Sequence, residues 1–204
     1  MSRNTMARNG DLRRAILDES RRLLLEQGYG HVSMRKVAAA VGCTATSIYL
    51  HFDSKDALIH ALIEEGMDLL HADLEKAAAT DGPAEVRYEA LCRAFLDFGL
   101  GNPEYYEIMF QLTPREMQRY PSEKYRRARR NLEFFASVMA EARAGEPGFD
   151  PLLASTVLWS QLHGALSLLH ARRVDARYDT PAFIDGIVDH ARSLMQPTGP
   201  SSPS

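Results

Sequence analysis

The chain has 204 residues, of which 45% are hydrophobic and 25% charged, with a formal net charge of -3 and two cysteines. This composition excludes a disordered chain, a fibrous protein and a disulfide-rich secreted scaffold. No apolar run reaches the roughly 18 residues that would span a bilayer, and residues 1–10 lack the apolar stretch of a secretory signal. We therefore expect a cytoplasmic protein with no membrane partner.

The charge is distributed unevenly along the chain. Residues 1–60 contain nine Lys and Arg against six Asp and Glu, a balance of +3, and the remaining residues have a balance of -6. The overall acidity therefore does not exclude a nucleic-acid partner, because one end of the chain is basic.

Apolar residues recur at helical spacing from end to end, and residues typical of helix ends separate the segments. Ser33, Thr44 and Ser54 are predicted N-caps, and Gly42 is a predicted stop. No pair of segments alternates as paired strands do. The predicted fold class is therefore all-α, with helices over residues 11–27, 33–40, 44–52, 55–80, 83–100, 103–110, 122–143, 150–171 and 180–195.

Residues 33–52 have the spacing of a helix-turn-helix. Ala38 is small enough for two helices to approach, Gly42 permits the turn, and Ile48 lies where an apolar residue locks the pair. The N-terminal end of the second helix then carries small side chains, and this end of a recognition helix enters the major groove. The alternative is a three-helix bundle with no DNA role.

Side chains around this motif suit a DNA backbone and base edges. Ser33, Tyr49 and Lys55 offer two hydroxyls and a cation to phosphates. Thr46, Ser47 and the methyl group of Ala45 suit base edges, and Arg35 suits a guanine or a phosphate. Tyr49 has an alternative role as a half-buried aromatic residue that packs on the first helix.

The stretch from Met34 to Leu58 resembles the DNA-binding signature of the tetracycline-repressor family, most specifically in the Tyr-x-x-Phe-x-x-Lys-x-x-Leu pattern that begins at Tyr49. Ala15–Leu17 and Gly28–Gly30 match the family's first helix and turn. The resemblance implies a double-stranded operator DNA partner, with the contacts Ser33, Arg35, Thr44, Ala45, Thr46, Ser47, Tyr49, Leu50, His51 and Lys55.

The C-terminal half resembles the Trp-His-Gly type of domain in this family. The resemblance is carried by residues 102–110 and by Trp159–Gly164, and it implies a small-molecule pocket and a homodimer. The candidate ligand-binding residues are Phe98, Tyr105, Met109, Phe110, Met117, Phe135, Trp159 and His163. Each has a structural alternative, because aromatic and Met residues at helical spacing are more often core; for Trp159 and His163 the two interpretations are evenly balanced.

Two apolar or small-residue stripes near the C-terminus predict a dimer interface. The last two helices of each subunit would form a four-helix interface by two-fold symmetry, as the resemblance implies. The predicted interface residues are Ser160, Gly164, Ser167, Ala171, Ile184, Ile187, Val188, Ala191 and Met195. The alternative is that these residues are buried within one chain.

The expected organisation is a DNA-binding domain over residues 1–54, a linking helix over 55–80, a ligand-sensing and dimerisation domain over 81–196 and a disordered tail over 197–204. The helix that begins at Lys55 is expected to be the only continuous link between the DNA-binding and ligand-binding parts. His60, Glu64, His71 and Glu75 share a stripe predicted to face solvent rather than to bind a metal.

The sequence thus predicts a ligand-responsive transcriptional regulator, a repressor, with no cofactor, metal or catalytic residues. The rival is a small helical enzyme or metal-binding protein in which the helix-turn-helix is scaffold. That rival requires a nucleophile–base pair, a metal cluster or a phosphate loop, and the sequence shows none of these patterns.

Overall fold

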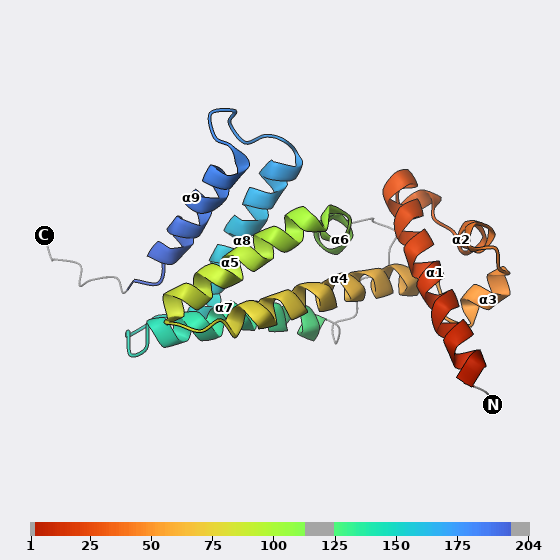
Figure 1. The fold of residues 1–204 in the computed structure, drawn as a ribbon, viewed down its shortest axis with the longest axis horizontal. Coiled ribbons are helices and arrows are strands. Elements are labelled where there is room, and N and C mark those ends of the chain that lie inside the picture. The colour runs from red at the N-terminus through yellow and green to blue at the C-terminus, as the bar shows by residue number, and fades with distance from the viewer. Residues whose placement is uncertain (1–2, 113–124, 197–204) are drawn as a thin grey trace, which may run out of the picture. The chain divides into compact units, whose positions relative to one another are not determined.

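The computed structural model describes residues 3–112 and 125–196, and all regular elements in these two ranges are helical (Figure 1). The elements are α1 (Arg3–Gln27), η1 (Tyr29–His31), α2 (Met34–Val41), α3 (Ala45–Tyr49), α4 (Lys55–Ala78), α5 (Ala84–Gly101), α6 (Pro103–Tyr106), the π-helical η2 (Glu107–Gln111), α7 (Tyr125–Ala142), α8 (Pro151–His170) and α9 (Thr180–Ser193). The all-α prediction is confirmed.

Local signals place the helix ends. Ser33 Oγ accepts from the Lys36 amide at 3.3 Å, Thr44 Oγ1 from Ser47 at 3.1 Å, and Ser54 Oγ from Ala57 at 3.0 Å. Gly42 ends α2 with φ of 78°, a left-handed conformation that disfavours residues with a side chain. The three predicted N-caps and the predicted stop are confirmed.

The chain divides into two compact units. The first contains residues up to Gly66 and, further along the described chain, 104–112; the second contains residues 67–103 and the described residues from 125 onward. The prediction that α4 alone links the two parts is therefore wrong, because the chain also passes between the units after Pro103 and again between residues 112 and 125.

The first unit is built around the helix-turn-helix. α1 packs on α2, α2 packs on α3, and α1 also contacts η1. Ala38 and Ile48, the two residues predicted to bring the helices together, are both buried, and Ile16 and Val37 are fully covered beside them. This burial supports the spacing argument made from the sequence.

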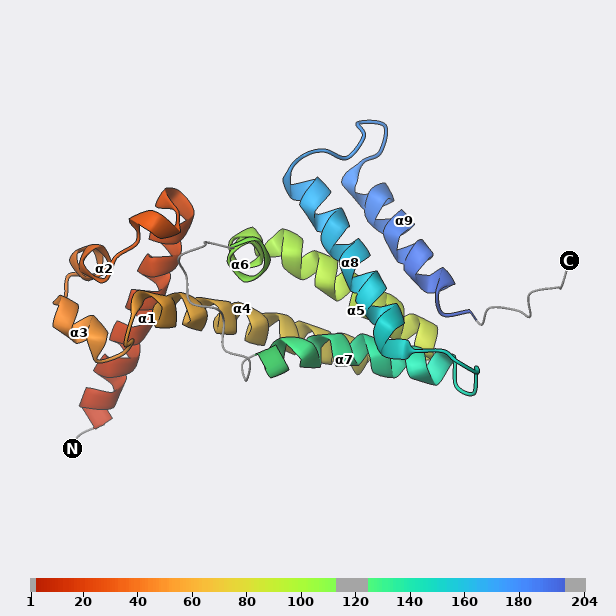
Figure 2. The same ribbon diagram turned by 180° about the vertical axis from the view of Figure 1, so that it is seen from behind.

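The second unit is a bundle in which α5 packs against α7, α8 and α9. α8 and α9 lie side by side as an antiparallel pair (Figures 1 and 2). Asp150 and Asp179 cap them: Asp150 Oδ1 accepts from the amides of Leu152 and Leu153, and Asp179 Oδ1 from Ala182. Large side chains, among them Tyr88, Phe95 and Phe135, fill the core.

Two expectations about helix surfaces are corrected. His60 is buried rather than exposed, and His71 is half-buried, with Nδ1 2.7 Å from Asn131 Oδ1. α4 therefore buries more than its one apolar stripe. α8 contains Ser, Thr, Gln and His but no Asp, Glu, Lys or Arg. It is long and apolar enough to cross a membrane by length and composition, a test that core helices of soluble proteins also pass.

Candidate nucleic-acid interface and aromatic cluster

The first turn of α3 projects small polar side chains from the first unit. Thr44 and Thr46 are exposed, and the Tyr49 and Leu50 side chains are 52% and 82% exposed. Ile48 points the other way and is fully buried. An α-helix that buries one residue and exposes its neighbours in this way presents a continuous hydroxyl-bearing face, which suits the major groove.

The hydroxyls on this face have different amounts of free hydrogen-bonding capacity. Thr44 Oγ1 lies 2.8 Å from Ser47 Oγ and also accepts from the Ser47 amide, so both groups hold the end of α3 together. Ser33 is likewise committed to its cap, beside the exposed Arg35. Thr46 is exposed and takes no part in these two caps.

The surroundings of Lys55 and His51 differ from those of simple exposed phosphate contacts, which the sequence predicted for both residues. Lys55 Nζ donates to the Tyr29 carbonyl at 3.1 Å and lies 3.6 Å from the centre of the Tyr29 ring. Tyr29, which sequence reasoning did not single out, therefore fixes Lys55 in place, and its hydroxyl donates to the neighbouring Asp56. His51 is half-buried, and its covered Nε2 has no hydrogen-bond partner among the residues that the structure describes.

The second unit contains a connected cluster of aromatic rings from α5, α7 and α8. The Trp159 ring centre lies 4.6 Å from that of Phe95, 5.8 Å from Phe135 and 5.4 Å from His163. Tyr88 extends the cluster, with its ring 6.1 Å from Phe135. Burial lowers the pKa of His163 to about 4, so its imidazole is neutral at neutral pH.

The structure brings together only part of the predicted ligand site. Phe98, Phe135, Trp159 and His163 belong to the second unit. Tyr105, Met109 and Phe110 belong to the first unit, where the Tyr105 hydroxyl accepts from Arg21. Met117 lies outside the described residues. Phe95 was not among the predicted ligand residues, although its ring is the nearest to Trp159 of the three measured.

The predicted dimer residues also separate into two groups. Ser160, Gly164, Ser167 and Ala171 are exposed along α8, and Ile184 and Ile187 of α9 are half-exposed. Val188, Ala191 and Met195 are instead buried within the chain, because this side of α9 packs on its own unit. The interface expected at these three residues is corrected accordingly. The exposed α8 side chains Leu152, Leu153, Val157 and Leu168 were not predicted.

Comparison with known proteins places both halves of the chain. The family described as bacterial regulatory proteins, tetR family, matches residues 16–62, and the one described as tetracyclin repressor-like, C-terminal domain, matches residues 88–191. The HTH-type transcriptional repressor Rv1474c of Mycobacterium tuberculosis is 40% identical over 60 residues, which are 29% of this chain and 32% of that protein. The matches to the curated relatives span between 32% and 45% of those proteins' lengths.

Solved structures share the fold over nearly the whole chain. A bacterial regulatory protein of the tetR family from Rhodococcus RHA1 superposes with a TM-score of 0.72 at 19% identity, covering 92% of this chain and 98% of that one. The structure of AibR in complex with isovaleryl coenzyme A and operator DNA has a TM-score of 0.66 at 22% identity, covering 88% and 97%. With the second family match alone spanning half of its residues, the chain belongs to the tetracycline-repressor family.

Proposed function

We propose that this chain is a ligand-responsive transcriptional regulator, a repressor rather than an enzyme, which binds a palindromic operator as a homodimer in the cytoplasm. The observation that carries the proposal is the hydroxyl-bearing exposed face of α3, held by the Thr44 cap and backed by the buried Ile48. The repressor Rv1474c, which is 40% identical to this chain over 60 residues, supports the direction of regulation.

DNA binding is divided between backbone and base contacts. Tyr49 and Lys55 offer a hydroxyl and a cation to phosphates, with Ser33, Arg35, Thr44 and His51 around them, and such contacts fix the register without selecting sequence. Thr46 is left for base edges, Ser47 reaches them when its hydroxyl turns away from Thr44, and the apolar Ala45 and Leu50 suit thymine methyl groups. In the bound dimer the two α3 helices lie roughly 34 Å apart, one turn of DNA.

The exposed face of α8 is our proposed dimer interface. The side chains of Leu153, Val157 and Leu168 are apolar and exposed. Gly164 has no side chain, and a Cβ atom built there would meet nothing within 4 Å, so the helix surface is open at this position. Two such helices with the Ile184 and Ile187 side of α9 complete a four-helix contact by two-fold symmetry. A partner on this face would also explain why only 28% of the apolar α8 window is buried.

The aromatic cluster around Trp159 is our proposed effector site. Rings from three helices and the neutral His163 favour an apolar or amphipathic effector over a cation, because the four contacting residues supply no negative charge. The complex of AibR with an acyl-coenzyme A and operator DNA shows that a protein of this fold accommodates both kinds of partner. The effector acts by binding more tightly to the conformation that does not fit the operator.

Selection from random duplex DNA with the full-length chain tests the proposal. We expect a palindromic sequence whose affinity falls as salt rises, because phosphate contacts release counterions. The selected operator, placed before a reporter gene, should lower expression when the chain is present, whereas raised expression would identify an activator. Failure to select any sequence, together with turnover of a substrate, would sink the regulator in favour of the enzyme.

A further inference from the structure

The second unit buries polar side chains that the fold leaves unpaired. In its described part, the buried side chains that carry an oxygen or a nitrogen atom are Tyr88 of α5, Asn131 of α7 and Ser155 of α8, and all three are fully covered. Tyr88 Oη, Asn131 Nδ2 and Ser155 Oγ have no hydrogen-bond partner within the described chain. A buried polar atom without a partner lowers stability, so three of them in one core require an explanation.

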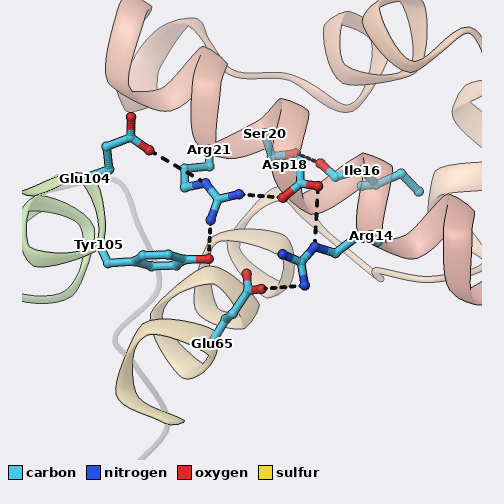
Figure 3. Close-up of polar contacts among 8 residues, drawn as sticks. All are labelled: Arg14, Ile16, Asp18, Ser20, Arg21, Glu65, Glu104 and Tyr105. Atoms are coloured by element: carbon cyan, nitrogen blue, oxygen red, sulfur yellow. Dashed lines mark hydrogen bonds and ion pairs between the residues drawn. The ribbon is translucent and has the colours of Figure 1, made fainter. Parts of the chain in front are cut away.

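Buried hydroxyl groups of the first unit are paired (Figure 3). The fully covered Ser20 Oγ donates to the Ile16 carbonyl at 2.6 Å, and the hydroxyl of the buried Tyr105 accepts from Arg21. A serine and a tyrosine of the first unit thus have partners, whereas the buried serine and tyrosine of the second unit have none in the described chain. Unpaired hydroxyls are therefore a feature of the core that contains the aromatic cluster.

The three unpaired side chains lie beside rings of that cluster. Asn131 precedes Phe135 by four residues on α7, and Ser155 precedes Trp159 by four residues on α8, so the members of each pair share one helix face. The ring centre of Tyr88 lies 6.1 Å from that of Phe135. The unpaired atoms therefore belong to the same three helices as the rings, and to the faces that carry them.

The hydrogen-bonding capacity of these atoms defines what could pair with them. Asn131 uses half of its amide, because its Oδ1 lies 2.7 Å from His71 Nδ1 in the same unit, and Nδ2 is left over. An amide nitrogen can only donate, and the hydroxyls of Tyr88 and Ser155 can both donate. The type of group that could pair with all three is therefore an acceptor oxygen.

The same core offers no opposite charge to an ionised ligand. Among the described residues of the second unit, no Asp, Glu, Lys or Arg side chain is buried. Burial raises the pKa of the Tyr88 phenol, raises the pKa of the Cys92 thiol to about 12 and lowers the pKa of His163 to about 4, so all three stay neutral at neutral pH. A carboxylate or an ammonium group placed among them would lose its hydration without gaining a counter-charge.

We propose that the effector is an uncharged compound with an aromatic or other apolar body, whose carbonyl, ester or ether oxygen atoms accept hydrogen bonds from Tyr88 and Ser155. This inference rests on the proposed function, because it gives the chemistry of the effector site placed there around Trp159. Trp159 and His163 are half-exposed and mark the side on which a ligand enters. Large side chains fill the core, so a ligand has to move rings apart, and the two hydroxyls become paired only in the complex.

The first test measures the thermal unfolding of the ligand-free chain at one fixed chain concentration. Tyr88→Phe and Ser155→Ala each remove an unpaired oxygen without removing a hydrogen bond, so each should raise the melting temperature, by about 2–4 °C. The controls are Tyr178→Phe, at an exposed tyrosine, and Ser137→Ala, at an exposed serine of α7. Ser137→Ala brings the same gain in helix propensity as Ser155→Ala, so the difference between them isolates the buried hydroxyl.

The sign of this change decides between a ligand and a structural role. A melting temperature that falls would mean that a bound water already pairs the hydroxyl, which then stabilises the core. A change no larger than that of the matched control would mean that the hydroxyl is hydrated. Either result for Tyr88→Phe or Ser155→Ala overturns the inference.

The second test measures the binding of matched small molecules by the fluorescence of Trp159. Acetophenone and acetylnaphthalene carry a ketone, ethylbenzene and ethylnaphthalene carry an alkyl group in its place, and benzoate and naphthoate carry a carboxylate. The wild-type chain should bind at least one ketone more tightly than the hydrocarbon and the carboxylate of the same ring size. Tyr88→Phe and Ser155→Ala should each weaken the binding of that ketone about three- to tenfold and leave the binding of the hydrocarbon unchanged.

Tyr178→Phe and Ser137→Ala should bind all of these compounds as the wild-type chain does. Binding of neither ketone, tighter binding of a carboxylate, or equal losses for the ketone and the hydrocarbon overturns the inference. Both tests are carried out without DNA. A wild-type chain that selects no operator therefore refutes the proposed function, while the melting temperatures and the ketone preference still decide the inference.

Discussion

Lys55 Nζ donates a hydrogen bond to the backbone oxygen of Tyr29 at 3.1 Å and lies 3.6 Å from the centre of the same residue's ring. The first residue of α4 is therefore part of the packing that joins α4 to η1. Its ammonium group still has donors to offer, because three N–H bonds are available and one carbonyl uses only one of them. Lys55 can serve the fold and a phosphate together.

Replacing Lys55 by Ala should therefore have two effects. Operator affinity should fall for all sequences, and the slope of log affinity against log salt should decrease by about one, because one phosphate contact is lost. Stability should fall by about 1 kcal/mol from the lost cation–π contact. Lys76→Ala is the control, since Lys76 lies at the other end of α4 and pairs with Asp73. An unchanged salt slope in Lys55→Ala would remove Lys55 from the DNA contacts.

Substitutions at Thr44 and Thr46 should distinguish the effect of losing a helix cap from the effect of losing a base contact. Thr44→Ala removes the cap of α3, which is worth about 1 kcal/mol, and should weaken binding to every sequence alike; Thr44→Ser should restore it. Thr46→Ala should leave helix content unchanged and relax the preference at one base position by about 1–3 kcal/mol. Binding measured against single-base operator variants distinguishes the two, and the reverse pattern would show that the contacts have been assigned wrongly.

His163 should make the stability of the second unit depend on pH. Because its folded-state pKa of about 4 lies below the ordinary value near 6.5, the unfolded chain takes up this proton first as the pH falls. The contribution of the neutral His163 to the free energy of unfolding is present above about pH 6.5. It is lost as the pH falls from about 6.5 to 4, by up to about 3 kcal/mol. Urea unfolding followed by the fluorescence of Trp159, the only tryptophan, measures it.

His163→Phe is the comparison for this pH dependence. Carboxylates titrate in both proteins, so the difference between wild type and variant isolates the histidine. We expect the wild-type advantage to shrink as the pH falls through this window. A constant difference between the two proteins would mean that His163 keeps its ordinary pKa and is well hydrated.

Gly164→Leu should break the dimer. Within one chain a Cβ atom at this exposed position meets nothing within 4 Å, so the monomer can accept the larger side chain. Against a second copy of α8 the same side chain would prevent close approach of the helices. Sedimentation should therefore show monomers of unchanged helix content. Ala140→Leu on the exposed side of α7 is the control and should remain dimeric; a dimeric Gly164→Leu would place the interface elsewhere.

The sequence predicted the helix-turn-helix well because its signals are local. Ser33, Thr44 and Ser54 bond to amides three residues away, and Gly42 adopts its left-handed conformation for the turn beside it. Such contacts depend on neighbouring residues and are visible in the spacing of the sequence alone. The start of the first helix was predicted less well. α1 begins at Arg3, whereas the sequence predicted a start at Asp11, because residues 3–10 have little apolar periodicity that would indicate a helix.

Long-range pairings were the part that could not be predicted. Arg21 and Tyr105 are 84 positions apart, and each has an ordinary local explanation, as a solvated Arg on α1 and as a pocket aromatic residue. His60 was misplaced because periodicity assigns one apolar stripe to a helix, whereas α4 is covered on more than one side. The sequence prediction also assigned three residues to the dimer interface that are buried within the chain, namely Val188, Ala191 and Met195. The apolar arc of this last helix is wide, and the sequence does not show which part of the arc packs on its own chain and which part on a partner.

The uncovered apolar face of α8 has a consequence for gene regulation. If the chain binds its operator only as a pair, then below the dimer dissociation constant the concentration of active protein rises with the square of the chain concentration. A twofold fall in the amount of chain then removes about three-quarters of the dimer. The exposed leucines and Val157 along α8 would thereby set a threshold, so that dilution at cell division can relieve repression with no effector present.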